Sequence, residues 1–128
     1  MKRKRLLVID DEPEICSIIR TLLEDEVGDV VTAEKTEEAL HILNEQKFDL
    51  ILTDIMMPGM SGTKLLSKIN SGDQKTPVIF ISGVDAPEYV AQLNSMGAVG
   101  YLSKPFMAEE LIKSVHQALE GKSFLKAE

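Results

Sequence analysis

Apolar runs and segments of helical spacing alternate along the chain, and this pattern occurs five times. The runs predict strands at residues 6–9, 29–32, 49–53, 77–81 and 98–102. The first, third and fourth runs are apolar at successive positions, which is typical of strands that are covered on both faces. The alternation favours an α/β fold, a doubly wound five-stranded parallel sheet with five helices on its two faces, joined by right-handed crossovers.

The predicted helices follow these strands and carry their own end signals. The first begins at Pro13, because proline is tolerated in a first helical turn, and Gly28 is expected to close it. Its apolar residues have the spacing of a buried face: Ile15, Ile18, Ile19, Leu22 and Leu23. The same reasoning predicts a second helix at about residues 36–46, a third around Leu65, Leu66 and Ile69, a fourth around Val90 and Leu93, and a fifth from Leu111 to a stop at Gly121.

The size and composition of the chain fit one domain with its own hydrophobic core. Of the 128 residues, 44% are hydrophobic and 27% are charged, which argues against disorder. We assign residues 1–121 to one domain and residues 122–128 to a C-terminal tail or a truncated linker. No apolar run approaches the ~20 residues of a membrane span, and the first run is shorter than the ~7–15 residues of a signal-peptide core. We therefore expect a cytoplasmic protein.

Charge and cysteine content exclude several classes of function. The formal net charge of −7 argues against nucleic acid as a direct partner. Cys16 is the only cysteine, which excludes an internal disulfide and a cysteine metal site, and we expect its side chain to be buried on a helix. His41 and His116 fall on predicted helices without a nucleophile beside them, so neither is expected to be catalytic.

Polar residues follow four of the five predicted strands close to the point where each strand ends. Asp10 and Asp11 follow the first strand, Asp54 the third, Ser82 the fourth and Lys104 the fifth. The carboxyl ends of parallel strands meet at one edge of the sheet, where open α/β proteins bind their ligands. We therefore expect three carboxylates, a hydroxyl and an amine to converge at this edge.

This set of groups suits phosphoryl transfer to a carboxylate. Three crowded carboxylates repel one another unless a cation is present, and an all-oxygen ligand set favours Mg²⁺. The Lys104 ammonium suits a phosphoryl oxygen, and the Ser82 hydroxyl can donate a hydrogen bond. Asp54 needs no general base, because an ionised carboxylate is already a nucleophile. The residues alone leave open that Asp54 only caps a turn and that Asp10 or Asp11 caps the first helix.

Four short motifs occupy these strand ends in order: Val8-Ile9-Asp10-Asp11-Glu12, Leu52-Thr53-Asp54, Ile81-Ser82-Gly83 and Ser103-Lys104-Pro105, with a turn at Met57-Pro58-Gly59-Met60-Ser61-Gly62. Together they resemble the receiver domain of bacterial two-component response regulators over residues 6–121. The resemblance implies a flavodoxin-like sheet with strand order 2-1-3-4-5, and makes residues 1–121 a receiver domain. It also implies a phosphorylation-dependent signalling switch rather than an enzyme, with slow self-phosphorylation from small phosphodonors and self-dephosphorylation.

The resemblance implies a role for each matching residue at the acidic side of the site. Asp54 is the expected phosphoacceptor and also a metal ligand. Asp11 is expected to bind Mg²⁺ directly and Asp10 mostly through water. The backbone carbonyl of Met56 would complete the metal ligands that the protein supplies.

The remaining roles belong to the last two strands. Lys104 is expected to pair with the phosphoryl group, Ser82 to move and hydrogen-bond a phosphoryl oxygen, and Tyr101 to turn inward behind it. The bond between Lys104 and Pro105 is expected to be cis. A strand tyrosine is most often a packed amphipathic side chain, so this second interpretation of Tyr101 stays open.

The resemblance also implies two kinds of protein partner. A sensor histidine kinase or a histidine phosphotransfer protein would donate the phosphoryl group, docking on the first helix around Ile15 and Ser17 and near Pro105 and Phe106. The fourth helix, fifth strand and fifth helix would then present a changed surface. Its partner would be a downstream effector protein, an effector domain, or a second copy in a phosphorylation-linked dimer, without direct contact to nucleic acid or membrane.

Two other functions fit a similar fold but match the motifs poorly. An Asp-nucleophile, Mg²⁺-dependent phosphatase of the haloacid-dehalogenase type has an Asp-x-Asp motif after its first strand, and many such enzymes carry a cap domain. Here the acids after the first strand are adjacent and no segment of cap size is expected. A non-catalytic, flavodoxin-like binding module needs a phosphate-cradling loop after the first strand, where Asp10, Asp11 and Glu12 would repel phosphate.

Overall fold

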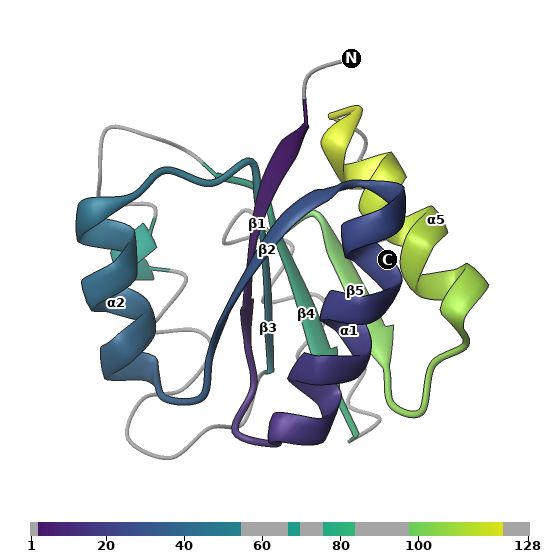
Figure 1. Ribbon diagram of the computed structural model, residues 1–128, viewed down its shortest axis with the longest axis horizontal. Helices are drawn as coiled ribbons and strands as arrows, with labels where there is room; N and C mark the ends of the chain where they lie inside the picture. Colours follow the sequence, from purple (N-terminus) through teal and green to yellow (C-terminus); the bar gives the residue numbers. More distant parts are fainter. Residues whose placement is uncertain (1–2, 55–66, 70–75, 84–97, 122–128) are drawn as a thin grey trace.

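A computed structural model of the chain describes residues 3–54, 67–69, 76–83 and 98–121 (Figure 1). The elements are β1 (Lys4–Ile9), α1 (Pro13–Glu26), β2 (Gly28–Ala33), α2 (Thr36–Glu45), β3 (Leu50–Asp54), β4 (Val78–Ser82), β5 (Gly100–Ser103) and α5 (Ala108–Leu119). Residues 67–69 are helical, within the predicted third helix. The predicted fourth helix, the turn after Asp54 and the tail at residues 122–128 lie outside the described residues.

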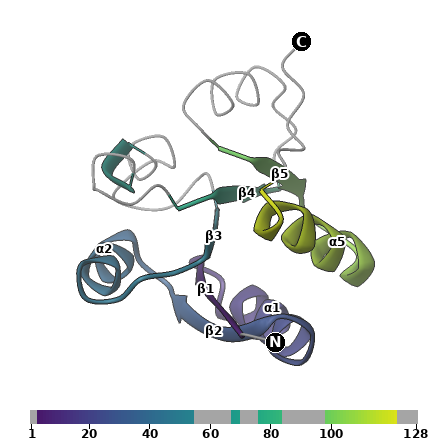
Figure 2. The same ribbon diagram turned by 90° about the horizontal axis from the view of Figure 1, so that it is seen from above.

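The five strands form one parallel sheet in the order β2-β1-β3-β4-β5, which confirms the predicted fold. The register pairs Asp54 with Ile81 and Ser82 with Ser103, so neighbouring strands end almost level with one another. Viewed from above, α1 and α5 lie on one side of the sheet and α2 lies on the other (Figure 2). This doubly wound arrangement gathers the carboxyl ends of the strands at one edge.

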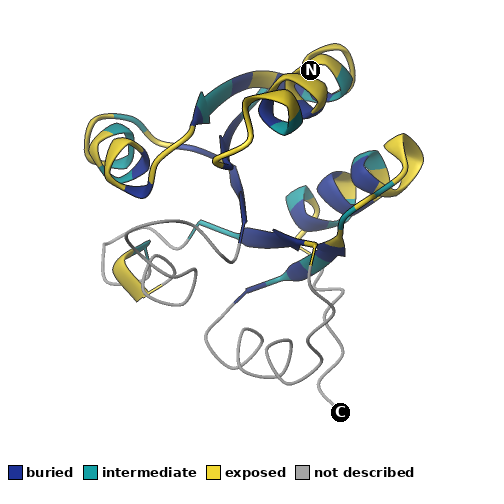
Figure 3. Ribbon diagram, turned by 90° about the horizontal axis from the view of Figure 1, so that it is seen from below, coloured by how far each residue is buried: buried dark blue, intermediate teal, exposed yellow. Residues whose placement is uncertain are grey.

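The strands are buried on both faces because each face carries its own hydrophobic core. In β1, Leu6 and Val8 pack into the cluster beneath α1 and α5, whereas Leu7 and Ile9 pack into the cluster beneath α2. All four side chains have no exposed surface. In Figure 3 the strands are accordingly buried, while the outward-facing sides of the helices are exposed. Successive apolar residues thus serve opposite cores, as the sequence pattern predicts.

Two predictions for the first helix and its end are wrong. Gly28 does not close α1, which ends at Glu26; it is the first residue of β2 and pairs with Lys4. A Cβ atom at Gly28 would lie 1.9 Å from the carbonyl oxygen of Lys4, so close strand pairing is the reason for a glycine here. Ile18 has the spacing of the buried face, yet it is 50% exposed because it lies at the margin of the apolar stripe.

Other details agree with the sequence. Cys16 is buried in the core under α1, and both His41 and His116 are exposed. α5 stops just before Gly121, whose positive φ of 83° favours glycine. The peptide bond between Lys104 and Pro105 is cis, as predicted.

The contact at Gly28 predicts a large effect of a single methyl group. The substitution Gly28→Ala should lower the free energy of unfolding by about 2 kcal/mol or more, because the backbone of β1 must move away. Urea unfolding followed by circular dichroism measures this. The matched control is Gly83→Ala, where the nearest atom to an added Cβ, the Cβ of Lys104, lies 4.0 Å away. Equal stability losses in the two variants would contradict the prediction.

Candidate functional site

The ends of four strands bring the predicted site residues together. Asp54 and Ser82 are the last residues of β3 and β4, and Asp10 and Lys104 directly follow β1 and β5. Backbone hydrogen bonds continue the sheet past its strands, since the Asp10 N–H donates to the Ala33 carbonyl at 3.0 Å and the Lys104 N–H to the Ser82 carbonyl at 2.7 Å. The backbone positions of these residues are therefore set by the sheet itself.

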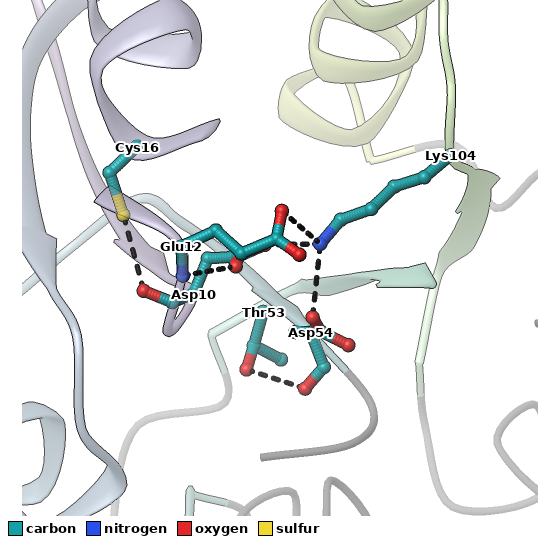
Figure 4. A network of polar contacts seen from close by, with 6 residues as sticks. All are labelled: Asp10, Glu12, Cys16, Thr53, Asp54 and Lys104. Atoms are coloured by element: carbon teal, nitrogen blue, oxygen red, sulfur yellow. Dashed lines mark hydrogen bonds and ion pairs between the residues drawn. The ribbon is translucent and has the colours of Figure 1, made fainter. Parts of the chain in front are cut away.

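The ammonium of Lys104 reaches across the edge of the sheet to carboxylates from two other strand ends (Figure 4). Its Nζ lies 2.8 Å from Asp10 Oδ2 and donates a hydrogen bond to Asp54 Oδ2 at 3.0 Å. A third carboxylate, that of Glu12, has its Oε2 3.8 Å from Nζ. The side chain of Lys104 is only 14% exposed, so water screens these ion pairs weakly.

The ion pairs change the acidity of the lysine. Burial by itself would lower the pKa of Lys104, but the hydrogen bonds and charges of Asp10 and Asp54 outweigh it and raise the pKa above its usual value. The ammonium therefore stays charged at any physiological pH. A fixed positive charge beside Asp54 suits phosphoryl transfer, because that chemistry depends on charge neutralisation.

Three carboxylates at this edge form a group that suits a divalent cation. Oxygen atoms of Asp10, Asp11 and Asp54 all lie within 4.8 Å of one another. Asp10 is fully buried; its Oδ1 accepts the Glu12 N–H at 2.9 Å, and its Oδ2 lies 2.8 Å from Nζ of Lys104. A buried carboxylate oxygen that faces two other acids fits a hard cation such as Mg²⁺, directly or through water.

The alternative role of Asp10 or Asp11 as a helix cap is not supported. The N-cap position of α1 is Glu12, and no side chain makes a capping hydrogen bond there. Asp11 is exposed next to the buried Asp10. Both acids therefore remain available to the cluster that they form with Asp54.

The other predicted residues have mixed outcomes. Ser82 is buried at the end of β4, one position beyond the residue that pairs with Asp54. Tyr101 is half-buried in β5 and packs against the core cluster beneath α2, so its role as a switch stays a prediction. Met56 lies outside the described residues, and its carbonyl as a metal ligand also stays a prediction.

The structure adds two residues whose contacts were not predicted. Glu12 faces Lys104, and Cys16 Sγ donates to the backbone carbonyl of Asp10 at 3.4 Å. Burial, together with the charge of Asp10, raises the pKa of the Cys16 thiol to about 11, so it remains a neutral donor. The contact of Glu12 could have been suspected from the sequence, because Glu12 is the third acid in the run Asp10-Asp11-Glu12. No such indication existed for the contact of Cys16, which lies one turn into α1.

Comparison with known proteins identifies the family. The family model described as "Response regulator receiver domain" matches residues 6–116. The chain therefore belongs to this family. The boundaries of the receiver domain at residues 1–121 and of the tail stay a prediction.

Curated relatives of this receiver domain are longer proteins. The transcriptional regulatory protein YkoG of Bacillus subtilis is 34% identical over 120 residues, which cover 93% of this chain and 52% of YkoG. The two-component response regulator ARR10 of Arabidopsis thaliana is 39% identical over 124 residues, 95% of this chain and 22% of that protein. The chain thus spans about half, or less, of the length of these relatives.

Solved structures agree with the fold and the family. The receiver domain of the Francisella response regulator 1452 has a TM-score of 0.85 and 34% identity, covering 93% of this chain and 98% of the other. The BeF3-activated receiver domain of DrrB has a TM-score of 0.85 and 28% identity, with 93% and 99% covered. DrrB comes from Thermotoga maritima.

Membership of this family makes the chain a phosphorylation-dependent signalling switch of two-component systems. Receiver domains bind Mg²⁺ at an acidic pocket, and Asp10, Asp11 and Asp54 form an acidic cluster here. The phosphatase and flavodoxin-like alternatives are not favoured by these matches. Among the described residues, no helix combines the length and apolar character that a membrane crossing requires.

The acidic cluster predicts how one charge affects stability. The substitution Asp11→Asn should raise the melting temperature in EDTA by a few degrees, because it removes a charge that repels Asp10 and Asp54. It should also abolish most of the stabilisation that Mg²⁺ gives the wild type. Thermal unfolding with EDTA and with Mg²⁺ measures both effects. Glu14→Gln, the same loss of charge in the first turn of α1, should keep the wild-type response to Mg²⁺.

Proposed function

We propose that Asp54 accepts the phosphoryl group from a histidine kinase or a histidine phosphotransfer protein, in a Mg²⁺-dependent reaction. The observation that supports this assignment most strongly is the Asp54 carboxylate at the end of β3, hydrogen-bonded to Lys104 and grouped with Asp10 and Asp11. Its side chain is 11% exposed, which suits a nucleophile that a phosphodonor reaches from outside.

The reaction needs an ionised carboxylate and charge neutralisation. A carboxylate oxygen of Asp54 forms a bond to phosphorus while the bond from phosphorus to the histidine nitrogen breaks, and the leaving imidazole takes its proton from solvent. Lys104 keeps a positive charge beside the transferred oxygens. Asp10, Asp11, Asp54 and the Met56 carbonyl would hold Mg²⁺, which when bound neutralises charge on the phosphoryl oxygens.

The switch lies in the last two strands. The added group brings about −1.5 to −2 charges to the edge of the sheet. We infer that the Ser82 hydroxyl moves to donate to a phosphoryl oxygen and that Tyr101 turns inward behind it. This shift biases an existing equilibrium between two states of the surface of β5, α5 and the predicted fourth helix. A downstream effector protein, an effector domain, or a second copy in a phosphorylation-linked dimer would read that surface.

Labelling with a small phosphodonor tests the assignment of Asp54. With acetyl phosphate and Mg²⁺, intact mass should show one added phosphoryl group on the wild type and none on Asp54→Ala or in EDTA. Asp25→Ala, an exposed acid near the other end of α1, is the matched control and should label normally. Absence of label on the wild type, or undiminished label on Asp54→Ala, would refute the proposal. The label should decay slowly, as expected of a signalling domain without multiple turnover.

The docking surface for the phosphodonor protein lies where two elements leave the site. α1 begins three residues after Asp10, and Met107 follows Lys104 by three residues. Ile18 on α1 is 50% exposed and Met107 is 71% exposed, and α1 packs beside α5 on the same face (Figure 1). Methionine is enriched in the core of protein–protein interfaces, and the exposed isoleucine offers further apolar area to a partner.

These side chains extend the predicted docking region. Of the four docking residues predicted from the sequence, Ser17 and Pro105 are exposed, and Ile15 and Phe106 are half-buried against the core. We therefore propose that a histidine phosphotransfer domain docks its helices on this region, with Ile18 and Met107 as apolar contacts.

A charge at Ile18 should separate docking from chemistry. The substitution Ile18→Asp should slow phosphoryl transfer about tenfold when the donor is a histidine kinase that labels the wild type. The reason is the loss of an apolar contact that becomes buried when the kinase docks. The rate of labelling by acetyl phosphate should not change. Radiolabel transfer measured at several kinase concentrations gives both the affinity and the rate. Asn44→Asp, which adds the same charge on α2 across the sheet, should behave as the wild type.

A further inference from the structure

Glu12 differs from the three acids that form the metal-binding cluster. It lies directly after Asp10 and Asp11 but is not one of the residues whose oxygens lie within 4.8 Å of one another. Its side chain is 60% exposed, whereas that of Asp10 is 1% exposed. Its backbone is nevertheless fixed, because its N–H donates to Asp10 Oδ1 at 2.9 Å and its carbonyl accepts from Ile15 and Cys16 at 3.1 and 3.2 Å.

The free end of the Glu12 side chain faces the ammonium of Lys104. Glu12 Oε2 lies 3.8 Å from Nζ, the longest of the three carboxylate contacts that this lysine makes. In Figure 4 the side chain of Glu12 reaches toward Nζ from the side of α1, while Asp54 approaches from β3. A carboxylate with a fixed backbone and an exposed, rotatable end can follow the ammonium when it moves.

A cation in the acidic cluster would compete with Lys104 for the same carboxylate. Asp10 Oδ1 is already occupied by the Glu12 N–H, so Oδ2 is the atom left to face a cation, and Nζ lies 2.8 Å from it. A divalent cation held by this oxygen, directly or through water, would lie close to the ammonium and repel it. Lys104 must therefore give up part of its contact with Asp10 when a divalent cation binds, and it needs another counter-ion.

We propose that Glu12 is a positioning residue that takes over the Lys104 ammonium when Mg²⁺ binds to Asp10, Asp11 and Asp54. The inference rests on the proposed function, because it assigns Mg²⁺ to these three residues. Glu12 holds the ammonium at the mouth of the site, close enough to Asp54 to meet an incoming phosphoryl group. It thereby strengthens Mg²⁺ binding by lowering the cost of moving the lysine.

A double-mutant cycle distinguishes this role from a general attraction of Mg²⁺ by a nearby acid. The Mg²⁺ dissociation constant is measured by NMR titration of the full chain in four forms: wild type, Glu12→Gln, Lys104→Met and the double variant. Glu12→Gln should weaken Mg²⁺ binding about threefold in the wild-type background. In the Lys104→Met background the same change should have almost no effect, because no ammonium is left to be held.

Controls make each outcome decisive. Glu14→Gln removes one charge from the first turn of α1 and corrects for the general field of the protein. Lys104→Gln replaces Lys104→Met if the apolar variant does not fold, which circular dichroism shows. The inference would be overturned if Glu12→Gln lowered the Mg²⁺ affinity equally in both backgrounds, or by no more than Glu14→Gln does. Labelling of the wild type by acetyl phosphate tests the proposed function separately. Failure of the proposed role of Glu12 is therefore distinguishable from failure of the proposed function.

Discussion

Charge balance at the carboxyl edge of the sheet depends on the ammonium of Lys104. The strand order places β4 between β5, which Lys104 follows, and β3, which ends in Asp54, with β1 beyond. The lysine side chain therefore extends past one whole strand to reach both Asp54 and Asp10. The long, unbranched side chain of lysine spans this distance, and its charge offsets the repulsion between the carboxylates.

Asp10 is held in place independently of that ion pair. Its N–H donates to Ala33, its carbonyl accepts from Cys16, and its Oδ1 accepts from Glu12. These contacts come from β2 and α1, the half of the domain opposite β5. The carboxylate is thus preorganised, and its placement costs little when a ligand binds. Three hydrogen bonds thus hold Asp10 from the β1–β2 side of the site without any contribution from β4 or β5.

Much of the fold and of the site follows from simple sequence rules, and the failures have physical reasons. The proximity of Asp54 and Lys104 was predictable, because the carboxyl ends of all strands in a parallel sheet lie at the same edge. The prediction for Gly28 was wrong because a glycine after a helix can either end the helix or allow two paired strands to approach closely, and the sequence does not distinguish the two. The predicted burial of Ile18 was wrong because apolar residues spaced by three and four positions form a stripe on the helix that is wider than the surface the core buries. The contact of Glu12 depends on side-chain rotamers, which spacing does not encode.

The hydrogen bond from the Lys104 N–H to the Ser82 carbonyl, 2.7 Å long, joins the two residues expected to respond to phosphorylation. A displacement of the end of β4 therefore pulls directly on the backbone that carries the lysine. Four residues later the chain enters α5 at Ala108, whose inner face is anchored in the core by Leu111 and Val115. One hydrogen bond and four residues of backbone thus connect the end of β4, beside the site, to a helix that covers the outside of the sheet.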